Sequence, residues 1–186
     1  MVRESRIIAD LLLKKVTPEQ WDEQILELNV LQKRTAGAAK RNATAIQKRL
    51  KLLEPEFLRA LRDGDDELAT QVSFCGAMER NLLLVEFIET VIKDAYLTRS
   101  MKLDTYSWTD FLEDRSHRDD SINQWKESSK LKMGQILFRM LAEVGYLKNS
   151  KSLELQHVIV RPELAFLLDE FFKHRIKKCF EVSLCT

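Results

Sequence analysis

The sequence has few residues that interrupt helices and few that bind metals. Among 186 residues there are only 5 glycines and 3 prolines, so long helices are favoured over a many-stranded sheet. The three cysteines are Cys75, Cys179 and Cys185. They lack metal-binding spacing, and an odd, unpaired set is typical of a reducing cytoplasm. We therefore expect no structural disulfide and no metal site.

Long apolar runs are also missing. The N-terminal run Ile7–Leu13 contains Asp10 and is too short for a signal peptide or a membrane span. The most apolar later window, Asn81–Ile92, contains Glu86 and Glu89 and is expected to be a core helix. With 45% hydrophobic and 32% charged residues, the composition predicts a soluble cytoplasmic protein that does not bind membranes.

Motifs for catalysis are absent as well. The sequence contains no glycine-rich phosphate loop, no HExxH and no CxxC. His117, His157 and His174 are far apart in the sequence and have unrelated neighbours. Asp119 and Asp120 are better explained as the start of a helix than as metal ligands. We therefore expect a protein that is not an enzyme and has no cofactor.

Helical periodicity covers most of the chain. Thr17, Pro18 and Gln20 have the arrangement of a capping box with proline in the first turn, at the start of a helix that runs to about Arg34. The other expected helices, besides the basic segment described below, cover residues 6–15, 55–62, 65–97, 107–117, 121–145 and 162–178.

The apolar period changes after Gly145. Residues 153–160 alternate between two faces, which predicts a short strand; in outline the helix, strand and helix resemble a winged-helix arrangement. We expect a mostly all-α fold, a compact helical bundle with this small strand element in its C-terminal half. The expected subdomains are 1–98 and 107–178, followed by a tail at 179–186.

Positive charge is concentrated in one segment, Lys33–Lys51. It holds seven basic residues and no acidic one, although the formal net charge of the chain is only +1. On a helix, the basic side chains occupy an arc of roughly 120°, extended by Arg49, opposite an apolar face. An ordinary solvated helix usually mixes both signs of charge. The pattern leaves two interpretations open, a solvated face and a surface that binds a polyanion.

Two weaker basic features lie in the C-terminal half. Ser128, Lys132, Gln135 and Arg139 recur at helical spacing, and a polar turn carries Lys148 and Lys151. Each is consistent with an ordinary solvent-exposed surface or with additional phosphate contacts. The basic residues at 173–178 are better explained by the favourable interaction of cations with a helix C-terminus.

Four segments are distinctive in their order along the chain, namely residues 4–13 (ESRIIADLLL), 125–130 (WKESSK), 141–147 (LAEVGYL) and 160–164 (VRPEL). With these segments the chain resembles the BrxA family of BREX phage-defence systems. The resemblance implies a small, mainly helical protein similar in fold to the antitermination factor NusB. It also implies double-stranded DNA binding and a non-enzymatic role in antiviral defence alongside other BREX proteins. RNA stays open as a ligand, because NusB-like proteins bind RNA.

The charge pattern and the resemblance together predict a DNA-binding accessory protein with weak sequence specificity, because phosphate contacts do not read bases. The alternative is an adaptor whose basic face docks an acidic partner. The candidate nucleic-acid-binding residues, chosen from the charge pattern alone, are Lys33, Arg34, Lys40, Arg41, Lys48, Arg49, Lys51, Lys132, Arg139, Lys148 and Lys151.

Overall fold

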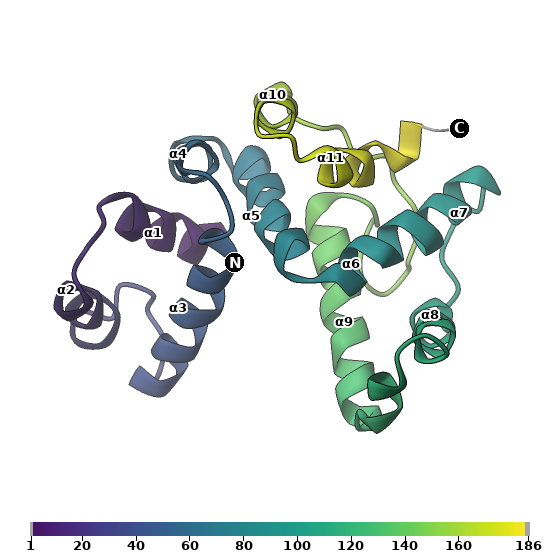
Figure 1. The fold of residues 1–186 in the computed structure, drawn as a ribbon, viewed down its shortest axis with the longest axis horizontal. Helices are drawn as coiled ribbons and strands as arrows, with labels where there is room; N and C mark the ends of the chain where they lie inside the picture. Colours follow the sequence, from purple (N-terminus) through teal and green to yellow (C-terminus); the bar gives the residue numbers. More distant parts are fainter. Residues whose placement is uncertain (1, 185–186) are drawn as a thin grey trace. The chain divides into compact units, whose positions relative to one another are not determined.

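The computed structural model describes residues 2–184 and is built from helices joined by turns and by longer connecting segments (Figure 1). No sheet forms in the described part, so the predicted all-α class is confirmed. The chain divides into two compact units. Unit 1 comprises residues 1–82 and 160–177, and unit 2 comprises residues 83–159 and 178–186. The subdomains expected from the sequence, residues 1–98 and 107–178, stay a prediction.

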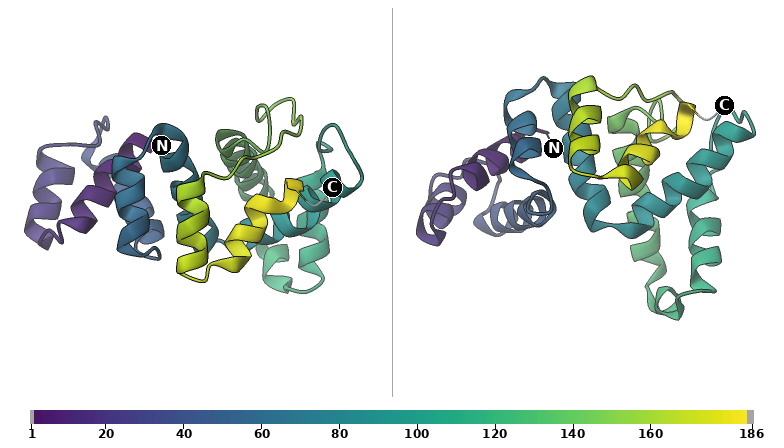
Figure 2. Two further views of the ribbon diagram at one scale, coloured as in Figure 1. Left: turned by 90° about the horizontal axis from the view of Figure 1, so that it is seen from above. Right: turned by 45° about the horizontal axis from the view of Figure 1, so that its top comes forward.

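Unit 1 is a layered helical assembly. Its elements are α1 (Val2–Leu13), α2 (Pro18–Asp22), the π-helix η1 (Glu23–Glu27), α3 (Ala36–Leu50), α4 (Pro55–Asp63), α5 (Asp66–Arg80) and α10 (Pro162–Glu170). Helix α1 packs against α3, α4 and α5, and α10 lies beside α4 and α5 (Figure 2). Arg161, the N-cap residue of α10, holds the start of that helix against α5. Its guanidinium pairs with Asp65 at 2.6 Å, and its backbone N–H donates to the side-chain oxygen of Gln71.

The helix that begins at Pro18 is shorter than predicted. Its capping box is confirmed, since Gln20 N donates to Thr17 Oγ1 at 3.3 Å and Thr17 N donates to Gln20 Oε1 at 2.9 Å. Helical structure nevertheless ends near Glu27 rather than Arg34. Asn29 adopts a left-handed φ of 44° and hydrogen-bonds both backbone groups of Lys33, which is turn geometry that asparagine favours.

The predicted long helix over 65–97 is interrupted. Helix α5 ends at Arg80, Asn81 is extended, and the chain continues as α6 (Leu82–Phe87), the π-helix η2 (Ile88–Ile92) and α7 (Lys93–Leu97). The helix expected from Ser121 is also shorter at its start. Residues 120–124 form the 3-10 helix η3 (Asp120–Gln124), and α9 (Glu127–Val144) follows two extended residues. It ends at Gly145, as predicted, with a left-handed φ of 101°.

Unit 2 contains α8 (Ser107–Ser116) and α9 around an aromatic core. The ring of Phe87 contacts Trp108, Phe111 and Phe138, with centroid distances of 5.8, 5.3 and 6.1 Å. The hydroxyl of Tyr146 donates to the backbone oxygen of Cys179 at 2.9 Å. This hydrogen bond ties the C-terminal segment of the chain to the end of α9.

The predicted strand is reduced to two isolated bridges, between Lys102 and Glu154 and between Leu147 and Leu155. Leu153 has a φ of 54°, which turns the chain out of extended geometry, so no regular strand or wing forms in the described part.

The predicted helix over 162–178 is also two helices. Phe172, with a φ of 55°, separates α10 from α11 (His174–Phe180). The expected tail continues as the 3-10 helix η4 (Glu181–Leu184), in which Val182 is buried.

Candidate nucleic-acid interface

Helix α3 presents two distinct faces. Its buried face consists of Ala39, Ala43, Ile46 and Leu50, as the periodicity predicts. Thr35 caps the helix by accepting a hydrogen bond from Ala38 N at 3.1 Å. The opposite side chains are exposed, and those among them that carry a positive charge are Lys40, Arg41 and Lys48. Arg34 precedes the helix and Lys51 is its C-cap residue, and both are also exposed.

The positive charges of these side chains are not paired with carboxylates of the described residues. Within residues 2–184, no carboxylate lies within salt-bridge distance of Arg34, Lys40, Arg41, Lys48 or Lys51. Other cations of unit 1 do have partners: Asp66 lies 2.9 Å from Arg6, Asp63 lies 2.7 Å from Arg62, and Asp65 lies 2.6 Å from Arg161. The α3 face is therefore a region of uncompensated positive charge.

Lys33 forms an ion pair within unit 1 and is not part of the exposed face of α3. It precedes α3, and its Nζ lies 2.7 Å from Glu4 Oε1, with side-chain exposures of only 25% and 16% for Lys33 and Glu4. The hydrogen bond from Lys33 is the main reason that the pKa of Glu4 is lowered. Because its charge is compensated, Lys33 adds less to the surface potential than Lys40 does.

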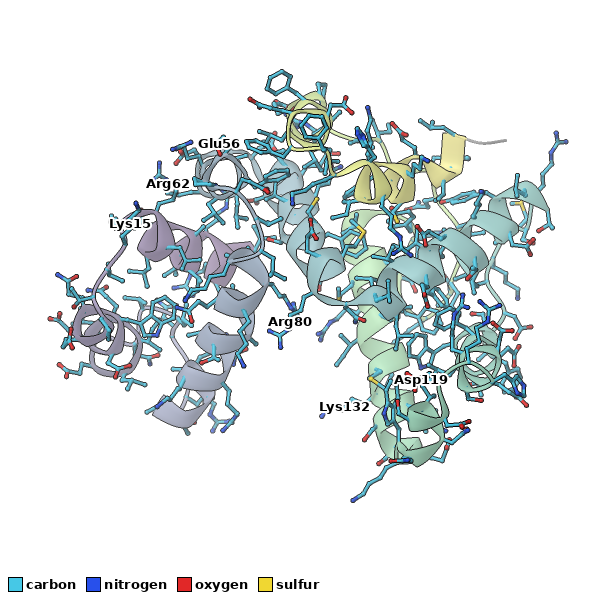
Figure 3. All side chains as sticks on the ribbon, in the orientation of Figure 1. Lys15, Glu56, Arg62, Arg80, Asp119 and Lys132 are labelled. Atoms are coloured by element: carbon cyan, nitrogen blue, oxygen red, sulfur yellow. The ribbon has the colours of Figure 1, made fainter. Side chains whose placement is uncertain are left out.

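Arg49 is half-buried beside a cation that the sequence did not indicate. Burial, and secondly the positive charge of Arg80, lower the pKa of Arg49. Arg80 is the last residue of α5 and is exposed (Figure 3). Sequence reasoning missed Arg80 because only the packing of α5 on α3 brings the two arginines together.

Unit 2 carries the second group of candidate residues. Ser128, Lys132, Gln135 and Arg139 are all exposed along α9, and Lys132 is labelled in Figure 3. Arg139 lies 3.8 Å from Glu143, so its charge is partly compensated. Ile136, which neighbours Gln135 on α9, is also 38% exposed.

The two lysines of the polar turn in unit 2 differ in their ion pairing. Lys148 pairs with Glu154 at 2.9 Å, which raises the pKa of Lys148. Lys151 is exposed and has no carboxylate within salt-bridge distance in the described part of the chain. Lys132 and Lys151 are thus the uncompensated cations among the candidates of this unit.

The basic residues near the C-terminus serve structural contacts. Lys173 lies 2.7 Å from Glu79 and 3.2 Å from Glu54, and these partners raise its pKa against the opposing effect of burial. Lys177 lies 2.7 Å from Asp169. These ion pairs agree with leaving this cluster out of the candidate interface.

Within residues 2–184, no group of three histidine, cysteine or acidic residues could hold a metal ion. A cleft of about 710 Å³ in unit 1 has Asp10 among its lining residues. The Asp10 carboxylate lies 2.6 Å from the ammonium nitrogen of Lys14, so its charge is already paired. His157 lines a cavity of about 450 Å³ in unit 2 and stacks on Tyr96 with centroids 5.5 Å apart. Burial raises the pKa of Tyr96 to about 12.

None of the described helices is long and apolar enough to span a bilayer.

Comparison with known proteins decides the family. The model of the BrxA family matches residues 1–171. The chain belongs to the BrxA family. The BREX protein BrxA of Paramagnetospirillum magneticum is 35% identical over 181 residues, covering 97% of this chain and 91% of that protein. The BREX protein BrxA of Escherichia coli O9:H4 is 32% identical over 168 residues, covering 90% and 79%.

A solved structure shares the fold. It is described as the crystal structure of an uncharacterized protein from Magnetospirillum magneticum, and it superposes with a TM-score of 0.89 at 34% identity. The match covers 98% of this chain and 93% of that one. The predicted family is therefore confirmed, and BrxA membership supports a role in phage defence with other BREX proteins as partners. The names of these relatives do not describe an enzyme.

Proposed function

We propose that this BrxA protein is a non-enzymatic accessory factor that binds double-stranded DNA in the cytoplasm through the phosphate backbone. The observation that carries the proposal is the exposed face of α3, where Lys40, Arg41 and Lys48 have no carboxylate partner within residues 2–184. Arg34 and Lys51 extend this positive surface at the two ends of the helix.

The dimensions of the face suit a nucleic-acid backbone. From Lys40 to Lys51 the chain advances by eleven residues, which is about 16 Å at 1.5 Å per residue. Duplex DNA carries one negative charge per about 1.7 Å of its axis. A helix face of this length therefore meets several phosphates at once, and binding would release their condensed counterions.

Uncompensated charge of one sign has a cost for the folded protein. Like charges at i,i+3 or i,i+4 spacing, such as Lys48 and Lys51, destabilise a helix by a few tenths of a kcal/mol. This cost disappears when a polyanion neutralises the face, so the arrangement favours the bound state. A face that served only solubility would gain by mixing in carboxylates, as α4 does with Glu56 and Arg59 at 2.7 Å.

Sequence specificity should be weak. Asn42, one of two amide side chains on α3, donates its Nδ2 hydrogen to the backbone oxygen of Ala38 at 2.9 Å. That amide is therefore engaged within its own helix and is less available for base edges. Lysine and arginine contacts to phosphates position a protein on DNA but carry no base information.

Additional contacts are proposed for unit 2. Lys132 and Lys151 are its uncompensated candidate cations, and Arg139 and Lys148 would contribute less because Glu143 and Glu154 lie beside them. Each unit is proposed to bind phosphate by itself.

An acidic protein partner and RNA are the competing ligands for the α3 face. Both would be attracted by the same cations. The test is a salt-titrated binding assay with duplex DNA, single-stranded DNA and RNA in parallel, supplemented by the acidic polypeptide polyglutamate as a mimic of a protein surface. Preference for polyglutamate or RNA over duplex DNA at equal charge would replace the proposed ligand.

Two variants with the same change in net charge make the assay specific. The α3 variant is K40Q/R41Q/K48Q, which removes the exposed cations and leaves the buried face of the helix intact. The control variant is K93Q/K102Q/R118Q, which removes three exposed cations of unit 2. None of the three is a candidate binding residue, and none has a carboxylate within salt-bridge distance in the described structure. Only the α3 variant should lose affinity for duplex DNA.

A further inference from the structure

Helices α3 and α5 approach one another closely where α5 has a glycine. A Cβ atom on Gly76 would lie 3.3 Å from the backbone oxygen of Arg49 and 3.4 Å from Leu53 Cδ1. Residues four apart on a helix share a face, so Arg80 lies one turn beyond this crossing on the side that faces α3. The crossing thus brings the end of α5 that carries Arg80 toward the end of α3 that carries Arg49, and the positive charge of Arg80 acts on Arg49.

Neither guanidinium has a carboxylate within salt-bridge distance in residues 2–184. Glu79, which adjoins Arg80 in the sequence, is directed to Lys173, where its Oε1 lies 2.7 Å from the ammonium nitrogen. The carboxylate next to Arg80 in the sequence is therefore already paired with another cation. Arg49 is also half-buried, so water screens the repulsion less than it would at an open surface.

Arginine remains charged under all ordinary conditions, so the pair cannot relieve its repulsion by losing a proton. The favourable solution is an anion with several oxygens between the two groups. Guanidinium groups donate pairs of parallel hydrogen bonds, which fit a phosphate group.

We infer that Arg49 and Arg80 form a clamp for a single phosphate group, at the junction of α3 and α5. Resting on the proposed function, we assign this clamp to one backbone phosphate of bound DNA, next to the phosphates held by the exposed α3 face. Arg80 is the new residue of this site. Free phosphate or pyrophosphate should occupy the same position, because the recognised chemistry is that of the phosphate group alone.

The test measures the melting temperature of the full chain with and without pyrophosphate, with ionic strength held constant by sodium chloride. For wild type, pyrophosphate at ten times its Kd should raise the melting temperature by roughly 3–6 °C. Arg80→Gln should lose this rise, and its melting temperature without pyrophosphate should equal or exceed that of wild type, because one repelling charge is gone. Affinity for duplex DNA should fall about tenfold, the equivalent of one charge-assisted contact.

Two further variants distinguish phosphate binding by Arg80 from a purely structural role of this residue. Arg80→Lys retains the charge and loses the paired donors, so it should show an intermediate rise, whereas Lys40→Gln should keep the full rise. A lower melting temperature of Arg80→Gln without pyrophosphate, or an undiminished rise with it, would overturn the clamp. If the α3 variant loses DNA affinity while pyrophosphate has no effect, the clamp fails and the proposed function stands. If pyrophosphate acts through Arg80 but no duplex DNA binds, the clamp stands and the proposed function fails.

Discussion

A glycine-to-alanine change in α9 should destabilise the protein, although alanine is the better helix former. Gly134 is buried in α9, and a Cβ atom there would lie 2.5 Å from Cδ1 and 2.9 Å from Cγ of Trp108. Trp108 is only 6% exposed, its ring lies against Phe87 and Phe111, and its Nε1 donates to the backbone oxygen of Lys130 at 2.8 Å. These contacts hold the indole in place, so it cannot move away from the added methyl group without losing some of them.

The expected magnitude follows from three contributions. Alanine in place of glycine in a helix interior favours folding by about 1 kcal/mol. Overpacking a well-filled core costs about 1–3 kcal/mol, and displacing the indole from Lys130 costs about 1 kcal/mol more in lost hydrogen bonding. The free energy of unfolding of Gly134→Ala should therefore fall by about 1–3 kcal/mol.

Urea denaturation followed by far-ultraviolet circular dichroism measures this difference. Gly37→Ala is a matched control, since a Cβ atom there would lie 3.4 Å from the flexible end of Arg41; its stability should be unchanged or raised by up to about 1 kcal/mol. If Gly134→Ala were as stable as wild type, the packing of α8 on α9, and with it the outward orientation of Lys132, would be refuted.

Two further predictions concern charge and thiols. The low pKa of Glu4 in the folded protein means that its contact with Lys33 stabilises the fold above the ordinary pKa of 4.5 and is lost as the pH falls through the folded-state value. In urea denaturation, the deficit of Lys33→Gln relative to wild type should thus be full at pH 7 and shrink below about pH 4.5; a deficit independent of pH would contradict this. Cys75 and Cys179 are buried within α5 and α11, and Cys185 lies outside the described residues. We expect no disulfide that folding needs, so a reductant should leave the melting temperature unchanged in a thermal scan; a marked fall would show a structural disulfide.

The two faces of α3 could be predicted from the sequence because they depend on local periodicity. Ala39 and Ala43 must be buried at helical spacing, and this alone turns Lys40 outward. The end of the preceding helix, which begins at Pro18, was not predictable in the same way. A side-chain contact of Asn29 ends helical structure before Lys33, and such contacts leave little trace in an apolar pattern.

Long-range contacts explain the rest of what the sequence did not indicate. Lys33 is neutralised by Glu4 across 29 positions, and Lys173 by Glu79 across 94 positions. Arg80 approaches Arg49 only because two helices cross. Charge counted along the chain cannot distinguish a paired cation from an uncompensated one, so the composition of the candidate interface depends on the folded structure.

The measurement that most directly tests the central claim is the salt dependence of duplex DNA binding by wild type, the α3 variant and the control variant. Wild-type affinity should fall with a slope of about −0.9 per neutralised phosphate. The α3 variant should unfold at the wild-type temperature, bind all duplex sequences more weakly, and show a slope smaller by roughly one unit per lost contact; the control variant should match wild type. A folded α3 variant with wild-type affinity and slope would contradict the account and leave α3 as a solvated face.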